Sequence, residues 1–298
     1  MLYRQLGKSS LRISEIGFGC MSLTENDAAS EHIIHRAIDY GINLFDTADI
    51  YANGRSEVCL GKAVSHKRTE VIIATKVGNQ VRKDGKGMDW NPRKGYIISS
   101  VEQSLKRLNT DYIDLYQLHG GTREDPIEET IEAFETLQQQ GKIRFYGISS
   151  IRPNVIREYV RRSSIISVMM QYSLLDRRPE ETCFELLEKN NIGVLARGSV
   201  AKGLLLDKPA EVYLNYSAAE TSKAATAVDL LSNEKRNPAQ TALRFVLNQK
   251  SIAAAVVGIR TLKQLDKAAR AVDTPPLTQN ELNYLQSILP ACRYEQHR

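Results

Sequence analysis

The feature that most constrains this chain is a regular alternation of short apolar segments with longer amphipathic ones along its 298 residues. The apolar segments have the length of buried strands, and helical spacing of apolar residues follows them, as between residues 29 and 40. Strands are predicted at residues 16–21, 42–47, 71–76, 112–119, 145–149, 168–172, 193–196 and 253–258. Helices are predicted at residues 29–40, 56–64, 96–108, 126–140, 154–161, 180–189 and 238–248.

These units predict the fold, because about eight parallel strands with helices between them close into a (β/α)8 TIM barrel. An open doubly wound sheet is the alternative, but its dinucleotide fingerprint needs a third glycine and a helix directly after it, and residues 17–22 lack both. Residues 2–4 and 11–13 flank a turn and predict a β-hairpin that closes the barrel bottom. No linker divides the chain, so we expect one domain over residues 1–298.

Composition and charge limit the classes of function that this chain can have. Hydrophobic residues make up 42% and charged residues 25% of the chain, as in soluble globular proteins. The net charge of +5 comes from scattered basic residues, which argues against a nucleic-acid partner. The four cysteines lack the spacing of a zinc site, so we expect reduced thiols in a cytoplasmic protein, and no metal. We see no signal peptide or apolar run of membrane-spanning length and expect neither secretion nor membrane insertion.

Residues that can do chemistry lie at the ends of three consecutive predicted strands, at the edge where barrels carry their active sites. Asp46 closes one strand and Tyr51 follows in the loop, while Lys76 and His119 end the next two. Each residue alone is more often structural, such as a rim tyrosine or a core histidine. Their convergence on one mouth favours a shared catalytic role.

The four side chains suit proton transfer to a carbonyl group. A phenol has a pKa of about 10, and a lysine buried beneath it stabilises the phenolate and makes Tyr51 a general acid. Asp46 is the partner that keeps Lys76 charged, and a neutral His119 can donate a hydrogen bond to the carbonyl oxygen. No side chain supplies a hydride, so this chemistry requires a nicotinamide cofactor.

Further motifs lie in order along nearly the whole chain. They are Ile16-Gly17-Phe18-Gly19, Asp46-Thr47-Ala48 with Tyr51 and Ser56-Glu57, Lys76, Ser104-Leu105-Lys106-Arg107-Leu108, Asp111-Tyr112-Ile113-Asp114-Leu115 and His119. Together they resemble the aldo-keto reductases, in the bacterial branch with short loops, and are also similar to potassium-channel β-subunits. The resemblance implies a (β/α)8 barrel, NADPH as the cofactor, and a tetrad of Asp46, Tyr51, Lys76 and His119 that reduces aldehydes or ketones to alcohols.

The resemblance also implies contacts with the cofactor. Gln171 stands where a glutamine holds the nicotinamide carboxamide, residues 196–204 resemble the loop that crosses the pyrophosphate, and residues 258–261 resemble the segment that takes the 2′-phosphate of NADPH. The implied cofactor-binding residues are Gly19, Met21, Asp46, Ser149, Ser150, Gln171, Arg197, Gly198, Ser199, Val200, Lys202, Gly203, Gly258, Arg260, Thr261 and Gln264.

The chain departs from the family pattern at several cofactor positions. Ser150 and Ala268 each replace an asparagine, Arg197 a stacking tyrosine, and Gln264 a frequent arginine. A guanidinium at position 197 repels the positive ring of the oxidised cofactor, so Arg197 is predicted to favour the reduced form. The charge and hydroxyl at residues 260–261 still favour NADPH over NADH.

The substrate is predicted to be a small carbonyl compound that meets Tyr51, His119 and Trp90. Trp90 lies in one loop at the mouth, residues 78–93, and a second loop covers residues 208–237. The tail after the final helix is short, so we expect an open mouth and broad substrates.

Two other functions stay open. One is a regulatory module of the channel β-subunit type, which holds cofactor without turnover, and the other is a lyase that forms a Schiff base on Lys76. Turnover distinguishes the first, and Asp46 argues against the second because it keeps the amine protonated. A monomer is the default expectation.

Overall fold

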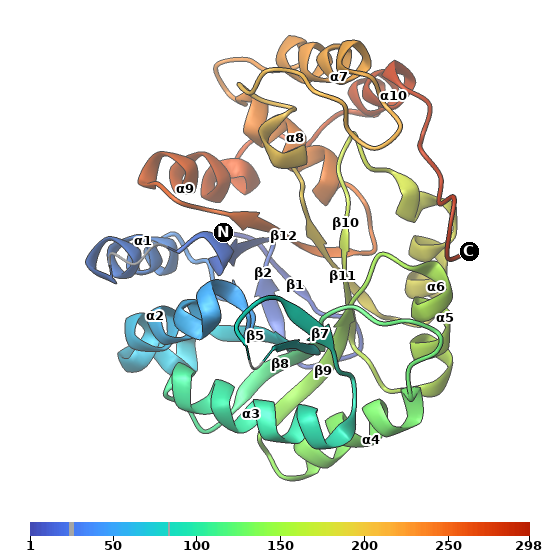
Figure 1. Cartoon of the computed structure of the whole chain (residues 1–298). Helices are drawn as coiled ribbons and strands as arrows, with labels where there is room; N and C mark the ends of the chain where they lie inside the picture. Colours follow the sequence, from blue (N-terminus) through green and yellow to red (C-terminus); the bar gives the residue numbers. More distant parts are fainter. Residues whose placement is uncertain (24–26, 83) are drawn as a thin grey trace.

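The computed structural model describes residues 1–23, 27–82 and 84–298. Its centre is a closed barrel of parallel strands (Figure 1). Within the described residues eight strands form this barrel, in the spatial order β10-β11-β12-β3-β4-β5-β8-β9. Their bounds are β3 (Ile16–Gly19), β4 (Leu44–Asp46), β5 (Ile72–Val77), β8 (Ile113–Leu118), β9 (Ile143–Ser149), β10 (Ser167–Gln171), β11 (Gly193–Arg197) and β12 (Ile252–Gly258). The predicted (β/α)8 fold is confirmed, and the alternative of an open sheet is wrong.

Helices connect the strands and surround them (Figure 1). They are α1 (Asp27–Asp39), α2 (Arg55–Val64), α3 (Lys94–Leu108), α4 (Ile127–Gln139), α5 (Pro153–Arg162), α6 (Cys183–Lys189), α7 (Ala218–Leu230), α8 (Pro238–Leu247), α9 (Leu262–Ala269) and α10 (Gln279–Ile288). Capping boxes fix where some of them begin, such as Ser217 with Glu220 at α7 and Asn237 with Gln240 at α8. Helices α7 and α10 pack together at the top of the view.

The barrel interior is a packed core. The predicted hairpin is present as β1 (Tyr3–Gln5) paired antiparallel with β2 (Arg12–Ser14). Its apolar residues plug the barrel, where Leu6, Leu11 and Ile13 form one cluster with Leu44, Ile72, Ala74, Leu115, Ile166, Met169, Leu195, Ala253, Ala254 and Val256. A larger cluster fills the layer between the strands and the helices. Because side chains fill the bottom, a site belongs at the carboxyl ends of the strands.

Two segments expected as loops contain regular structure. Residues 78–93 form an antiparallel hairpin of β6 (Asn79–Val81) and β7 (Met88–Trp90), while Lys83 lies outside the described residues. Residues 208–237 contain α7, whose alanine-rich sequence lacks a stripe of large apolar residues. The β6–β7 hairpin and α7 both lie in connections that leave the carboxyl ends of barrel strands, so they shape the mouth of the barrel.

The tail after α10 also reaches the mouth. Tyr216 Oη donates to the Pro290 carbonyl oxygen at 2.6 Å, and Asn215 Nδ2 donates to Glu295 Oε1 at 2.8 Å. Further along, the Asn154 amide donates to the carbonyl oxygen of His297 at 2.9 Å. The tail therefore lies along the loops that follow β9, β10 and β11, and the expectation that it leaves the whole mouth open is wrong.

Two features of the described residues bear on the classes of protein considered from composition. Within residues 1–23, 27–82 and 84–298, none of the helices has both the length and the apolar character needed to cross a bilayer. The same residues contain no group of three or more His, Cys, Asp or Glu side chains suited to a metal ion. Cys20, Cys59, Cys183 and Cys292 form no disulfide bond with any described residue.

Candidate active site

The structure brings together the four side chains that the sequence singled out. Asp46 is the last residue of β4, Lys76 lies near the end of β5, and His119 directly follows β8. Lys76 Nζ donates to Asp46 Oδ1 at 2.8 Å and to Oδ2 at 2.7 Å. The same Nζ lies 5.0 Å from the ring centroid of Tyr51. The Tyr51 and His119 rings meet edge to face, with centroids 5.9 Å apart.

Lys76 is held as a charged ammonium. Its third hydrogen bond goes to the Thr47 carbonyl oxygen at 2.7 Å, so three acceptors match its three donors. The side chain is only 1% exposed. Burial by itself lowers the pKa of Lys76, but the Asp46 carboxylate raises it above its ordinary value. The buried pair therefore places a positive charge beneath the phenol.

Tyr51 keeps its proton at neutral pH. Burial raises the pKa of its phenol, while the Lys76 charge opposes that shift. The sequence predicted the effect of Lys76, but in the structure burial outweighs it. The result is a protonated phenol next to a cation that stabilises its conjugate base.

His119 is a neutral imidazole. Burial lowers its pKa to about 3, and the charges of Lys76 and Arg197 act in the same direction. The His119 amide donates to the Val77 carbonyl oxygen at 2.7 Å, which fixes the residue at the end of β8. Its buried Nδ1 has no hydrogen-bond partner among the described residues. A neutral ring with an unpaired nitrogen suits hydrogen bonding to a ligand.

Most of the predicted cofactor residues lie at the ends of β9 to β12, whereas Gly19, Met21 and Asp46 lie at the ends of β3 and β4. Ser149 and Ser150 follow one another at the end of β9 and are both buried. Arg197 Nη1 donates to Gln171 Oε1 at 3.1 Å, and Gln171 Nε2 donates to Tyr213 Oη at 2.5 Å. Tyr213 was missed by sequence reasoning, because only the fold of residues 208–237 places it beside β10.

The loop after β11 has features that fit a pyrophosphate. Its backbone turns sharply, with φ of 71° at Gly198, 58° at Lys202 and 94° at Gly203. The hydroxyl of Ser199 is buried and has no hydrogen-bond partner in the part of the chain that the structure describes, so it can serve a ligand oxygen. Val200, between these residues, is half-buried. This loop thus combines an available donor, an exposed lysine and a tight turn.

The segment after β12 presents the predicted phosphate-binding charge. At Gly258 a side chain would meet open space. Arg260 is exposed, and Thr261 caps α9 by accepting from the Gln264 amide at 3.2 Å. Gln264 Oε1 in turn accepts from the Arg260 amide at 2.8 Å. The glutamine therefore orders this turn, and the guanidinium is the group left to meet an anion.

Other predicted residues have different surroundings. Trp90 Nε1 donates to Asp125 Oδ1 at 2.8 Å, and its ring packs on Gly78 and Gly120, where a Cβ would lie 2.6 and 3.2 Å from ring atoms. Trp90 thus anchors the β6–β7 hairpin, which is a structural role. Met21, just beyond Gly19 at the end of β3, is 62% exposed.

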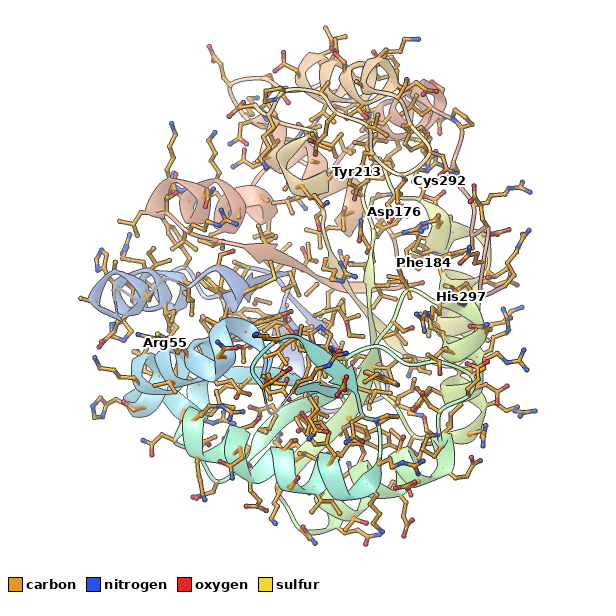
Figure 2. The ribbon with its side chains drawn as sticks, viewed as in Figure 1. Arg55, Asp176, Phe184, Tyr213, Cys292 and His297 are labelled. Carbon is orange, nitrogen blue, oxygen red and sulfur yellow. The ribbon has the colours of Figure 1, made fainter. Side chains whose placement is uncertain are left out.

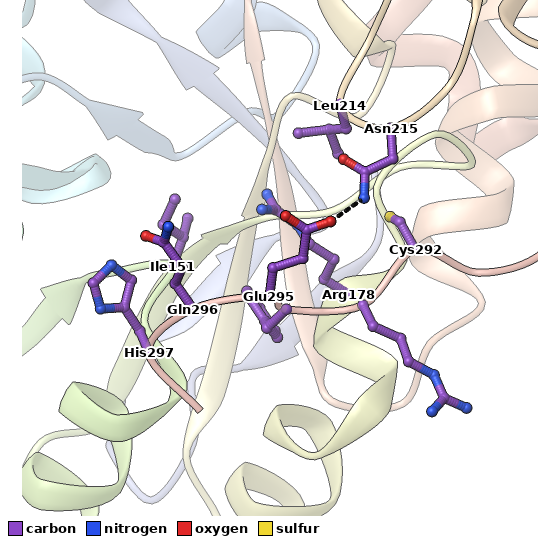
Figure 3. Close-up of a pocket in the computed structure, with 10 residues that line it drawn as sticks. Ile151, Arg178, Leu214, Asn215, Cys292, Glu295, Gln296 and His297 are labelled. Carbon is purple, nitrogen blue, oxygen red and sulfur yellow. Dashed lines mark hydrogen bonds between the residues drawn. The ribbon is translucent and has the colours of Figure 1, made fainter.

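A cavity of about 260 Å³ lies between the C-terminal tail and the loops after β9, β10 and β11 (Figure 3). Its lining residues are Ile151, Arg178, Leu214, Asn215 and residues 292–297. Figure 2 shows Tyr213, Asp176 and Cys292 on this same side of the molecule, with His297 further along the tail. Leu214, which lines the cavity, directly follows Tyr213 in the sequence, so the cavity lies next to the hydrogen bond between Gln171 and Tyr213. The tail therefore shapes this side of the mouth.

Comparison with known proteins places the geometry in context. Residues 15–290 match the model of the Aldo/keto reductase family. The chain is 47% identical to the uncharacterized oxidoreductase YqkF of Bacillus subtilis, with 100% of both proteins covered. The holo form of aldo-keto reductase AKR11C1 from Bacillus halodurans has a TM-score of 0.95 at 48% identity, covering 100% of this chain and 99% of that one. The glycerol dehydrogenase AKR11B4 from Gluconobacter oxydans has a TM-score of 0.85 at 27% identity, covering 96% and 94%.

Proposed function

The chain belongs to the aldo/keto reductase family and is a carbonyl-reducing oxidoreductase, and we propose that it reduces aldehydes and ketones to alcohols with NADPH. We assign the chemistry to Asp46, Tyr51, Lys76 and His119. The observation that carries this assignment is the buried Asp46–Lys76 pair, which holds an ammonium 5.0 Å from the ring centroid of a protonated Tyr51.

In the proposed reaction NADPH supplies the hydride. Tyr51 Oη donates its proton to the substrate oxygen, and the Lys76 charge stabilises the phenolate that remains. The imidazole of His119 donates a hydrogen bond to the same oxygen and orients the carbonyl group. Asp46 acts through Lys76, because the lysine would otherwise lose its proton in the buried site.

We further propose that the residues around Ser199 and Arg260 hold the cofactor. The support is the buried, unpartnered Ser199 hydroxyl in a sharply turned loop, together with the exposed guanidinium of Arg260 at the start of α9. A guanidinium recognises a phosphate by charge-assisted hydrogen bonds, which favours NADPH over NADH. Ser149, Ser150 and Gln171, at the ends of β9 and β10, are proposed to meet the nicotinamide end of the cofactor.

Arg197 is proposed to favour the reduced cofactor over the oxidised one, because its cation repels a positive nicotinamide ring. The measurement is the ratio of the dissociation constants for NADPH and NADP+, in the wild type and in Arg197→Tyr. Arg197→Tyr should tighten the oxidised form selectively. Similar affinities for the two forms in the wild type, unchanged by the substitution, would contradict this role.

The reaction is tested by NADPH oxidation with a panel of aldehydes and ketones, alongside Tyr51→Phe and an NADH control. Removing a general acid should lower kcat by about 10²- to 10⁴-fold while NADPH still binds. Binding without turnover on the whole panel would instead favour the regulatory-module function. The lyase has little support, since all three Nζ donors of Lys76 are engaged, and borohydride should trap no substrate on it.

Four broader expectations stay predictions. We propose that residues 1–298 form one domain, on the support of the single closed barrel among the described residues. The small carbonyl substrate, with Trp90 near it, is proposed on the position of the β6–β7 hairpin. The cytoplasmic location and the monomeric state are proposed from the sequence.

A further inference from the structure

The segment that follows Tyr51 has a backbone conformation that L-residues rarely adopt. Ala52, Asn53 and Gly54 have φ values of 48°, 54° and 85°, so three consecutive residues are left-handed. Of these, only the glycine adopts the conformation freely. Both non-glycine residues are exposed, and a hydrogen bond such as Asn53 N to Ile50 O at 3.2 Å is local. Support for this conformation must come from neighbouring elements.

Arg107 of α3 supplies support from behind the segment. A Cβ atom on Gly54 would lie 2.7 Å from Arg107 Cδ and 2.9 Å from its Nε, so the arginine packs directly on the glycine backbone. Arg107 Nε donates to Glu57 Oε2 at 2.6 Å, and Nη2 donates to Ser104 Oγ at 3.2 Å. The guanidinium is therefore fixed by partners on α2 and on its own helix.

Glu57 connects Arg107 to the strand that carries Lys76. Its carboxylate is fully buried, and Oε1 accepts from Thr75 Oγ1 at 2.6 Å. Because side chains alternate along a strand, Thr75 faces α2 while Lys76 faces the barrel interior. The neighbouring Ser56 shares a hydrogen bond of 2.8 Å with Thr47, whose carbonyl oxygen accepts from Lys76 Nζ. The start of α2 is thus tied to the surroundings of the ammonium.

We propose that Arg107 and Glu57 act as a positioning clamp, which holds residues 52–54 in the left-handed conformation and so keeps the Tyr51 phenol aligned with Lys76. The inference rests on the proposed reductase function. Neither clamp residue touches the reacting atoms, and each acts through the backbone that carries Tyr51. Without the clamp, residues 52–54 relax toward ordinary backbone conformations and the phenol moves away from the ammonium.

The variant Arg107→Met tests the clamp, because it keeps an unbranched apolar side chain and removes the donor to Glu57. Gly54→Ala acts from the other side, since its methyl group would displace Arg107, and it carries the test if Arg107→Met does not fold. The matched control is Arg68→Met. Arg68 pairs with the buried carboxylate of Asp114 at 2.8 Å, near the opposite ends of β5 and β8.

The kinetic readouts are kcat, the KM for an aldehyde and the dissociation constant of NADPH, with urea unfolding as the measure of stability. Arg107→Met should lower kcat about tenfold or more, since a displacement of about 1 Å can cost about 10²-fold. Its KM and NADPH affinity should stay within about twofold. Arg68→Met should lose comparable stability and keep kcat within about threefold. Arg107→Lys, which restores a cation, should recover part of kcat.

A second readout needs neither cofactor nor turnover. The charged and titratable groups around Tyr51 are Asp46, Lys76, His119 and Arg197, from four different elements. A phenol that moves away from Lys76 changes both its burial and the charge that acts on it, so the pH at which it titrates should change. NMR of isotope-labelled tyrosine, assigned with Tyr51→Phe, measures this in the ligand-free protein. The Tyr51 signal should shift in Arg107→Met and Gly54→Ala and stay in place in Arg68→Met.

Equal losses of kcat in Arg107→Met and Arg68→Met would overturn the clamp, as would an unmoved Tyr51 signal in Arg107→Met and Gly54→Ala. Failure of the proposed function has a different signature. The wild type would then oxidise no NADPH, or Tyr51→Phe would be as active as the wild type. In either case the tyrosine signal still decides whether the clamp exists.

Discussion

Replacing Asp46 by asparagine should lower the stability of the fold, because it leaves the Lys76 ammonium buried without its counter-charge. The lysine is 1% exposed and gives two of its hydrogen bonds to Asp46, at 2.8 and 2.7 Å. Removing one partner of such a buried pair costs about 3–5 kcal/mol. With an unfolding entropy of about 2 cal/mol/K per residue, a chain of 298 residues should melt roughly 5–8 °C lower.

The loss of stability in Asp46→Asn should depend on pH in a defined direction. In the wild type Asp46 raises the pKa of Lys76, so from neutral pH to about pH 10 the pair contributes fully, and its contribution is then lost as pH rises through the higher folded pKa of Lys76. In Asp46→Asn, burial acts alone and lowers the lysine pKa. The folded variant then binds fewer protons than the unfolded chain, so its stability rises with pH. The difference in melting temperature should be widest near neutral pH and narrow toward about pH 10.

Thermal unfolding followed by circular dichroism, from neutral pH upward, measures both effects. The control is Asp39→Asn, which breaks an exposed ion pair with Arg36 at 3.2 Å, where the two side chains are 57% and 46% exposed. That pair should be worth about 0–1 kcal/mol, or less than about 2 °C. If Asp46→Asn melted within this range, or if its deficit did not change with pH, the buried charged pair would not describe the protein in solution.

Three further predictions concern other parts of the molecule. Because burial lowers the pKa of His119 to about 3, the pH profile of kcat should show no histidine inflection between about pH 5 and 8, and His119→Gln should keep more activity than His119→Ala. Arg260→Gln should raise the KM for NADPH about tenfold or more and leave that for NADH unchanged, which steady-state kinetics with both cofactors would show. Gly147→Ala should destabilise the protein to urea by about 1–3 kcal/mol, since its Cβ would lie 2.6 Å from the Ser167 carbonyl oxygen, and an unchanged midpoint would refute this.

The barrel could be predicted because its strands and helices depend on local patterns, and the positions of Asp46 and Lys76 because strand ends converge in a barrel. The path of the C-terminal tail and the position of Tyr213 could not be predicted from the sequence, because both depend on contacts between residues far apart in the chain. The path of the tail follows from hydrogen bonds such as that of Tyr216 with Pro290. The placement of Tyr213 beside Gln171 requires the fold of a connection whose one helix, α7, is mostly alanine and small polar residues.

The residues proposed for proton transfer and those proposed for cofactor binding are held in place by different interactions. This difference affects how easily each group can be substituted. Asp46 and Lys76 are less than 10% exposed and satisfy each other, so a change at either leaves a buried group without its partner. Arg197, Arg260 and Gln264 are exposed, so a substitution there exchanges contacts with water and ligand at little cost to the fold. Of the four departures from the family pattern, those at positions 197 and 264 are exposed, while those at positions 150 and 268 are buried. Cofactor preference should therefore change more readily by single substitutions than the proton-transfer chemistry, which depends on the buried pair.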